Sequence, residues 1–205
     1  MLRPLRRTAL IGLVAAVAGL AAASSAAADA TIPFNNWTVS GSLTIAKLHQ
    51  SATLPSGATF NGTADLTTGT ITGDVSIPQF TTRLYVLGLP VDATLQFVEA
   101  RPVSGTVSIT NGNATVSATA ASFVHITRLS SPFLPLNLVG NSCQTSAPVV
   151  LPMNVTENAF TLLLHGFTSS GSTTIPPLES CGLATPLLDL LMAGPNNPFT
   201  VTLAP

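Results

Sequence analysis

The chain has 205 residues and a formal net charge of −1, and only 7% of its residues are charged. An ordinary soluble domain carries about 25% charged residues, so threonine, serine and asparagine supply most of the polarity here. Beyond the first ten positions the basic residues are Lys47, Arg83, Arg101 and Arg128. Four scattered cations cannot build the positive stripe that phosphate binding requires, so nucleic acid is not expected as a partner.

The first 28 residues are typical of a secretory signal peptide. Arginines within the first seven positions precede an apolar run over 9–23, and the triplet Ala26–Ala28 fits an A-x-A cleavage site. The run is shorter than the about 20 residues of a membrane span. We therefore expect cleavage after residue 28, leaving a single exported domain over 29–205 in an oxidising secreted or cell-envelope compartment.

Apolar and polar residues alternate over several stretches, for example over 37–45, 70–77 and 103–110. Such alternation indicates strands with one buried and one wet face, and hence an antiparallel sheet. Gly41, Gly73 and Gly105 fall on the apolar phase, where they indicate bulges or close sheet contact. The pattern predicts an all-β domain, as an antiparallel β-sandwich or flattened barrel of about nine strands.

Turn signals separate these stretches. The clearest are Pro55-Ser56-Gly57, Asn61-Gly62, Thr68-Gly69 and Asn111-Gly112-Asn113. Asn-Gly supplies the positive φ angles that tight hairpin turns need, so residues 104–120 are predicted to form a hairpin.

One segment near the C-terminus has a helical pattern. Residues 186–192 contain no β-branched side chain, and their leucines fit a helical stripe. Thr185 is a candidate cap with Pro186 at the first helical position, and Gly194-Pro195 would end the helix. We predict one short C-terminal helix over 186–192, followed by a last strand near 199–203.

Cys143 and Cys181 are the two cysteines of the chain. In an oxidising compartment two cysteines of one domain usually pair, whereas a redox-active pair typically has a close motif such as C-x-x-C. We predict a structural disulfide, with Cα atoms within about 7 Å. By the loop-closure model it would contribute roughly 4 kcal/mol.

The stretch Leu162-Leu163-Leu164-His165-Gly166-Phe167 looks like the strand-end His-Gly motif of α/β-hydrolases. That fold needs a downstream G-x-S-x-G elbow, an acid and a further histidine in that order, and neither an elbow nor a further histidine follows His165. We therefore interpret His165 as a strand residue. His49, His125 and His165 lack metal-ligand spacing. Asp65 and Asp74 flank a predicted turn and are interpreted as a solvated hairpin end, so no catalytic residue, cofactor or metal is expected.

Two stretches, 84–91 and 133–139, are more apolar than a one-sided strand requires. One interpretation is a central strand or sheet corner that is buried on both faces. The alternative is the lining of a cavity for a lipid or another apolar ligand. A transmembrane barrel is a third interpretation, against which the missing aromatic girdles count. The candidate lining residues are Leu84, Val86, Leu89, Phe133, Leu136 and Leu138.

The C-terminal third carries a resemblance in three places: 135–140 before Cys143, then Ile175-Pro176-Pro177 before Cys181-Gly182, and 193–200. In these segments it resembles uncharacterised exported β-rich proteins of actinobacteria. The resemblance implies export and a β fold, and it implies no catalytic residue.

Three functional hypotheses of different class follow. The first is a non-catalytic secreted or cell-envelope module that acts through its surface, for example against a cell-wall component. The second is a carrier that holds a lipid or another apolar ligand between sheets. The third is an enzyme of unrecognised type, which the absence of a catalytic motif disfavours.

Overall fold

The computed structural model describes residues 30–133 and 136–205, so the predicted signal peptide lies outside the described residues. Twelve strands form one antiparallel sheet. They are β1 Thr31–Ile45, β2 Gln50–Thr53, β3 Thr59–Asp65, β4 Thr70–Ser76, β5 Phe80–Val86, β6 Leu89–Thr110, β7 Asn113–Ser130, β8 Gln144–Thr145, β9 Val149–Asn158, β10 Phe167–Ile175, β11 Leu178–Glu179 and β12 Gly194–Ala204. Two short helices complete the fold, α1 Ala159–His165 and α2 Thr185–Met192, and a 3-10 turn over Gly182–Ala184 precedes α2.

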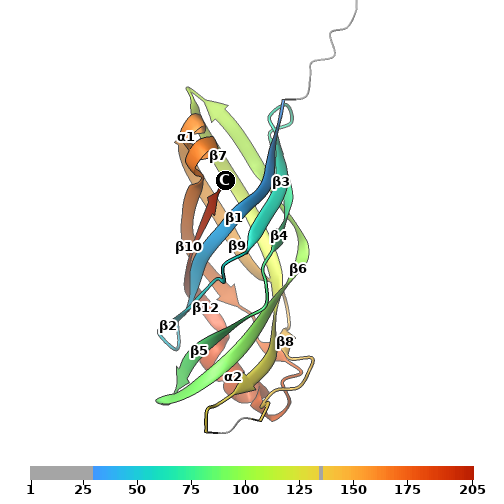
Figure 1. Cartoon of the computed structure of the whole chain (residues 1–205), viewed down its shortest axis with the longest axis vertical. Helices are drawn as coiled ribbons and strands as arrows, with labels where there is room; N and C mark the ends of the chain where they lie inside the picture. Colours follow the sequence, from blue (N-terminus) through green and yellow to red (C-terminus); the bar gives the residue numbers. More distant parts are fainter. Residues whose placement is uncertain (1–29, 134–135) are drawn as a thin grey trace, which may run out of the picture.

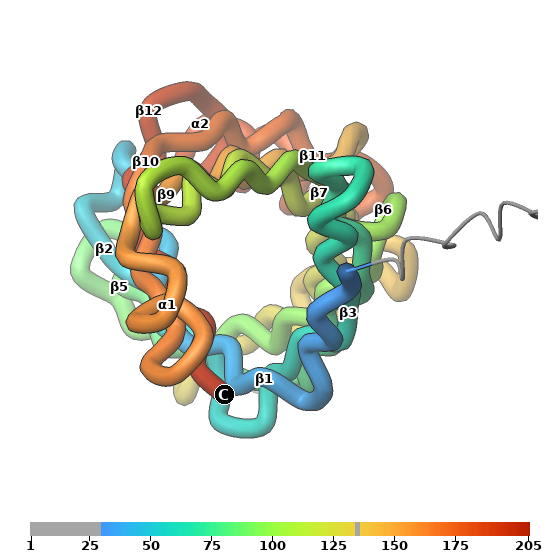
Figure 2. The backbone as a smooth tube through the Cα atoms, turned by 90° about the horizontal axis from the view of Figure 1, so that it is seen from above, coloured from blue at the N-terminus to red at the C-terminus, as the bar shows by residue number. Residues whose placement is uncertain are grey.

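The sheet is rolled about the long axis of the molecule, as Figures 1 and 2 show. Its strand order is β10-β12-β1-β3-β4-β6-β7, and β9 pairs with the far side of β7. The rolling brings the two edge strands β9 and β10 side by side. We call the end that carries α1 and the β6–β7 turn the upper end, and the end that carries α2 the lower end (Figure 1).

Side chains, rather than a backbone ladder, join the edge strands β9 and β10. The backbone N–H of Asn154 donates to Ser169 Oγ (3.1 Å), and the Ser169 hydroxyl donates to the Asn154 carbonyl (3.3 Å). The Thr173 hydroxyl donates to the Val150 carbonyl (2.6 Å). Ser169 and Thr173 are buried, so this β9/β10 seam satisfies polar groups that burial would otherwise leave unpaired.

Inward side chains form separate upper and lower cores. The upper cluster includes Phe34, Trp37, Phe60 and Phe199, and the ring of Phe34 meets that of Trp37 edge-on at 4.8 Å. The lower cluster surrounds the disulfide and Leu188 of α2. The lower end of the roll is therefore filled by the segment that carries α2.

The predicted all-β antiparallel architecture is confirmed, as a single rolled sheet that is not closed. The C-terminal helix is confirmed as α2, and the last strand as β12. The prediction of one helix is incomplete, because residues 159–165 form α1. His165, interpreted from sequence as a strand residue, is the last residue of that helix. The Asn158 side chain caps α1 by accepting from the N–H groups of Phe160 and Thr161.

Three of the four predicted turns are confirmed. The 104–120 hairpin turns at Asn111 and Gly112, whose φ angles are 51° and 79°, as a two-residue turn of this kind requires. The turn at Asn61-Gly62 is wrong, because both residues lie inside β3. Gly62 instead pairs with Gly73 of β4. A Cβ on either glycine would lie 2.6 Å from the Phe60 ring, so both positions need glycine for close packing.

Candidate functional site

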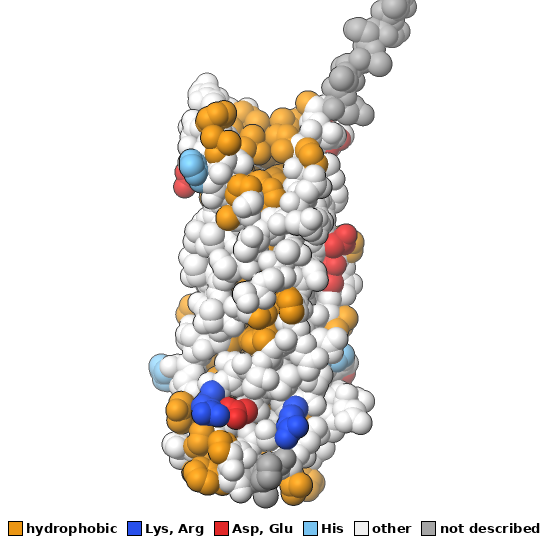
Figure 3. Space-filling view, in the orientation of Figure 1, with side chains coloured by type: hydrophobic (Ala, Val, Ile, Leu, Met, Phe, Trp, Pro, Cys, Tyr) orange, Lys and Arg blue, Asp and Glu red, His pale blue; other side chains and the backbone are white. Residues whose placement is uncertain are grey.

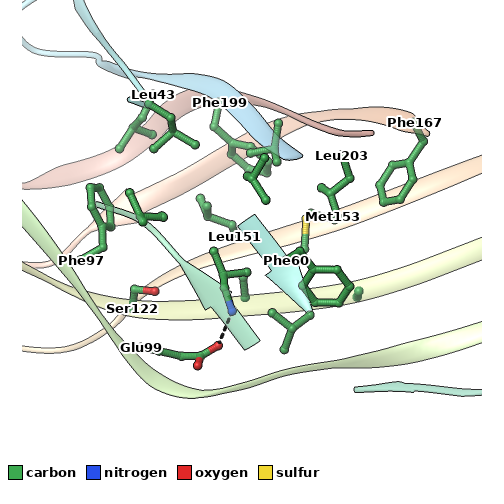
Figure 4. Close-up of a pocket in the computed structure, with 18 of the residues that line it drawn as sticks. Leu43, Phe60, Phe97, Glu99, Ser122, Leu151, Met153, Phe167, Phe199 and Leu203 are labelled. Atoms are coloured by element: carbon green, nitrogen blue, oxygen red, sulfur yellow. Dashed lines mark hydrogen bonds between the residues drawn. The ribbon is translucent and has the colours of Figure 1, made fainter. Parts of the chain in front are cut away.

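The upper half of the rolled sheet encloses an apolar cavity of about 120 Å³. Side chains from strands that are far apart in sequence converge on it, as the close-up in Figure 4 shows. Apolar residues dominate its lining, among them Phe60, Phe97, Leu151, Met153, Phe199 and Leu203. Leu162 of α1 also lines it, so the helix contributes its one buried side chain to this cavity.

Small residues account for the empty space. Ala118 and Ala120 of β7 line the cavity, and they alternate with outward residues such as the exposed Ser117. On the opposite wall the Phe60 ring lies against Gly62 and Gly73 instead of extending across the interior. Because inward positions of a rolled sheet must be filled by side chains, alanine and glycine at these positions leave a void.

A second cavity of about 60 Å³ continues toward the lower end. The two cavities share the lining residues Leu43, Leu54, Phe97 and Val149, so they lie end to end. The lower cavity reaches Met192 of α2. Together they give the interior an elongated apolar shape.

Glu99 is the one charged residue among the described residues that line the two cavities. It lies directly opposite Ser122 in the β6–β7 register, and both side chains line the upper cavity (Figure 4). Glu99 Oε1 accepts a hydrogen bond from the Val75 backbone N–H at 3.3 Å. Burial raises the pKa of the Glu99 carboxyl, the Val75 hydrogen bond opposes that change, and the nearby Asp74 adds to it.

This carboxyl occupies a break in the wall. The β4–β6 ladder reaches only to the pair Gly73–Val103, and the β5–β6 ladder begins at Phe80–Leu95. Between these points Glu99 supplies the acceptor for the Val75 N–H. The polar spot of the cavity therefore coincides with the place where the chain changes from β4 to β5.

The six candidate lining residues from sequence lie elsewhere than the two cavities. Leu84 is 4% exposed and packs with Ile45 and Ile175. Leu89 follows the β5–β6 turn and is 58% exposed, and Phe133 is 77% exposed. Val86 is half-buried, whereas Leu136 and Leu138 are exposed. Stretch 84–91 thus forms a hairpin end rather than a central strand, because β5 pairs only with β6.

The Cys143–Cys181 disulfide is present, with a Cα–Cα distance of 4.2 Å, which confirms the predicted pairing. It lies in the lower core, together with Leu95, Ile126 and Leu178, which line the lower cavity. Asp65 and Asp74 do not face each other: Asp65 pairs with Thr70, and Asp74 pairs with Asn61. Asp65 accepts hydrogen bonds from the N–H groups of the following turn, which lower the pKa of its carboxyl.

Glu99 was missed by sequence reasoning, although a signal was present. In the run Leu95-Gln96-Phe97-Val98-Glu99, the glutamate falls on the same phase as Leu95 and Phe97. A charged residue on the inward phase of a strand is uncommon, because burial penalises the ionised form. That departure from the pattern marks the polar site of the cavity.

The described residues contain no group of three or more His, Cys, Asp or Glu side chains placed to hold a metal ion. Over the same ranges no helix has the length and apolar character to cross a membrane. Comparisons with protein-family models, curated proteins and solved structures found no match to this chain. The cavity is therefore the structural feature of the described residues that points to a function.

Proposed function

We propose that this protein is a non-catalytic carrier that holds a single-chain lipid or similar apolar molecule inside the rolled sheet. The supporting observation is the elongated, almost wholly apolar interior. An apolar cavity of about 150 Å³ stays dry and binds small apolar molecules such as benzene. The two adjoining cavities, about 120 and 60 Å³, are of that order and suit one narrow hydrocarbon chain.

Export fits this activity, and we include it in the proposal. A disulfide such as Cys143–Cys181 forms and persists in oxidising compartments. The face in Figure 3 carries few charged side chains, and hydrophobic side chains gather at its upper end, below mid-height and at its lower end. Such a carrier would work in a secreted or cell-envelope location.

A fluorescent apolar probe tests the proposal. N-phenyl-1-naphthylamine should bind the mature protein, with emission that rises on transfer to an apolar site. Ligand at about 100 times its Kd should stabilise the fold by roughly 2.7 kcal/mol. Native mass spectrometry of protein purified from its own host should show a retained lipid.

Two matched variants locate the binding. Ala120→Phe places a ring in the cavity, whereas Ser117→Phe places the same ring on the exposed face of the same strand. Probe binding should fall at least tenfold in the first variant and persist in the second. Equal probe binding by the two folded variants would refute binding inside the cavity, and binding of neither the probe nor a single-chain amphiphile by the wild type would refute the carrier.

A further inference from the structure

The polar end of the ligand is the next property that the cavity constrains. Among the described residues that line the two cavities there is one carboxyl, Glu99, and no lysine, arginine or histidine. The other polar side chains of the upper lining are serines, one of which, Ser122, lies opposite Glu99. A carboxylate or phosphate head group would therefore enter a site without a cationic partner.

The surroundings of Glu99 add to this bias. Asp74 lies close enough to raise the pKa of the Glu99 carboxyl, and Asp74 itself is exposed. Two neighbouring carboxyls repel an anion and attract a cation, and the attraction is stronger beside an apolar wall than in water. Glu99 itself is only half-buried, so water reaches its carboxyl and a bound head group need not be fully dehydrated.

Glu99 has capacity for a further hydrogen bond. Its Oε1 accepts from Val75 N, but a carboxylate offers about four lone-pair positions. If Glu99 only replaced a missing strand partner as the acceptor for the Val75 N–H, it would use one of these lone-pair positions. The pair Glu99–Ser122 faces the cavity from two adjacent strands (Figure 4), so one ligand group can contact both.

We propose that the cavity selects single-chain amphiphiles whose polar end is a hydrogen-bond donor, a protonated amine above all, and that Glu99 receives this group with Ser122 beside it. Anionic amphiphiles are rejected. This inference rests on the proposed carrier function and names the chemical class of its ligand. Glu99 acts here as a specificity-determining residue, because it discriminates between head groups while the apolar wall binds the chain.

Three probes with the same chain and different heads test the selectivity: dodecylamine, 1-dodecanol and dodecanoate. Each competes with N-phenyl-1-naphthylamine at neutral pH, below the concentration at which it forms micelles. The amine should bind tightest and the dodecanoate weakest. The two should differ by at least about tenfold, as expected for a hydrogen bond to a charged group.

Glu99→Gln should reverse this order in part. The amide keeps an acceptor for Val75 N–H and for an alcohol but loses the charge. Amine affinity should fall about tenfold, dodecanol affinity should stay within about twofold, and dodecanoate affinity should rise. The matched control is Glu157→Gln, which removes the same charge from an exposed residue of β9 that does not line the cavities.

The outcomes separate the two proposals. Dodecanoate binding as tightly as dodecylamine to the wild type would overturn the selectivity while leaving the carrier function standing. Equal changes in Glu99→Gln and Glu157→Gln would also overturn it, because a distant charge would then explain the preference. Failure of all three compounds and of the fluorescent probe to bind would overturn the carrier function itself.

Discussion

The upper and lower halves of the same sheet contrast in how they are filled. In its upper part β7 turns Ala114, Ala118 and Ala120 inward, and the interior there is hollow. In its lower part the same strand turns the larger Ile126 and Leu129 into a core with the disulfide and Leu188, which leaves the smaller cavity that Ile126 lines. One strand therefore borders a larger or a smaller cavity according to the size of its inward side chains.

The difference in packing implies that the two halves of the sheet have different roles. Packed side chains gain dispersion contacts that the lining of a void lacks, so the lower half should supply most of the stability per residue. The disulfide reinforces that half, and the side chain of Asp189 in α2 accepts from Leu178 N at 2.5 Å. The upper half keeps room for a ligand, which on binding would contribute the missing contacts.

Removing the disulfide should have the largest effect and should act on the lower half. The double variant Cys143→Ser/Cys181→Ser opens a loop of sequence separation 38, so we expect a loss of about 4 kcal/mol in the free energy of unfolding. Hydrogen exchange should increase first in β8, β11 and α2. An equal increase throughout β1, β3 and β4 would contradict the division into two regions.

Two leucine truncations compare the regions directly. Leu188 is buried in the lower core and Leu203 lines the cavity, at 5% and 7% exposure. Leu188→Ala should cost about 4 kcal/mol and Leu203→Ala about 2 kcal/mol, within the range known for buried leucines. The cavity-lining residue has fewer contacts to lose. Urea denaturation measures both, and a larger loss at Leu203 would show that the upper half is the better packed.

The parts predictable from sequence were those that depend on local pattern. Alternation identified the strands, Asn111-Gly112 identified the longest hairpin, and Pro186 indicated where α2 starts. The predicted cap is wrong, because Thr185 is the first residue of the helix and Ala184 precedes it. The disulfide was predictable because two cysteines allow one pairing. By contrast, α1 was missed because Leu162-Leu163-Leu164 reads equally as a strand, and its cap Asn158 lies four residues upstream.

From sequence, an apolar cavity was only the alternative to strands buried on both faces, and its position was not predicted. Its walls combine residues such as Phe60, Met153 and Phe199 from strands that become neighbours only when the sheet rolls. The most apolar stretches were interpreted as buried on both faces or, alternatively, as the cavity lining, yet Leu89 and Phe133 are exposed. Apolar composition cannot distinguish an interior wall from an exposed hairpin end, because both lack charge. The volume of the cavity depends on which small side chains face each other across the rolled sheet.

The seam between β9 and β10 offers a sharper test of how the upper half holds its shape. Ser169→Ala leaves the Asn154 N–H and carbonyl without their side-chain partner across the seam, and this should cost about 1–2 kcal/mol. The neighbouring Ser170→Ala loses only an exposed hydroxyl contact to Thr200 and should change stability by less than about 0.5 kcal/mol. Equal stabilities of the two variants in urea would show that the seam hydrogen bonds do not hold the edges together.

The smallest effects should be opposite pH dependences of one carboxyl from each region. In the upper half, burial raises the pKa of Glu99. Its contribution to stability is therefore fully present below the pKa of an unfolded glutamate and is lost as pH rises through the folded pKa. The free-energy difference between wild type and Glu99→Gln should decrease with rising pH.

In the lower half, Arg83 holds Asp92 by two hydrogen bonds of 2.7 and 2.9 Å, which lower the pKa of that carboxyl. This contribution is present above the pKa of an unfolded aspartate and is lost as pH falls through the folded pKa, so the difference between wild type and Asp92→Asn should increase with rising pH. Urea denaturation across the acidic to neutral range measures how each free-energy difference changes with pH.

Added salt should flatten the pH dependence of the Asp92 difference, because the Arg83–Asp92 pair is exposed. It should leave the pH dependence of the Glu99 difference largely intact, because burial is the main cause of the raised pKa of Glu99. Slopes of the same sign would mean that the two carboxyls share one environment, against the contrast between a hollow half and a filled one.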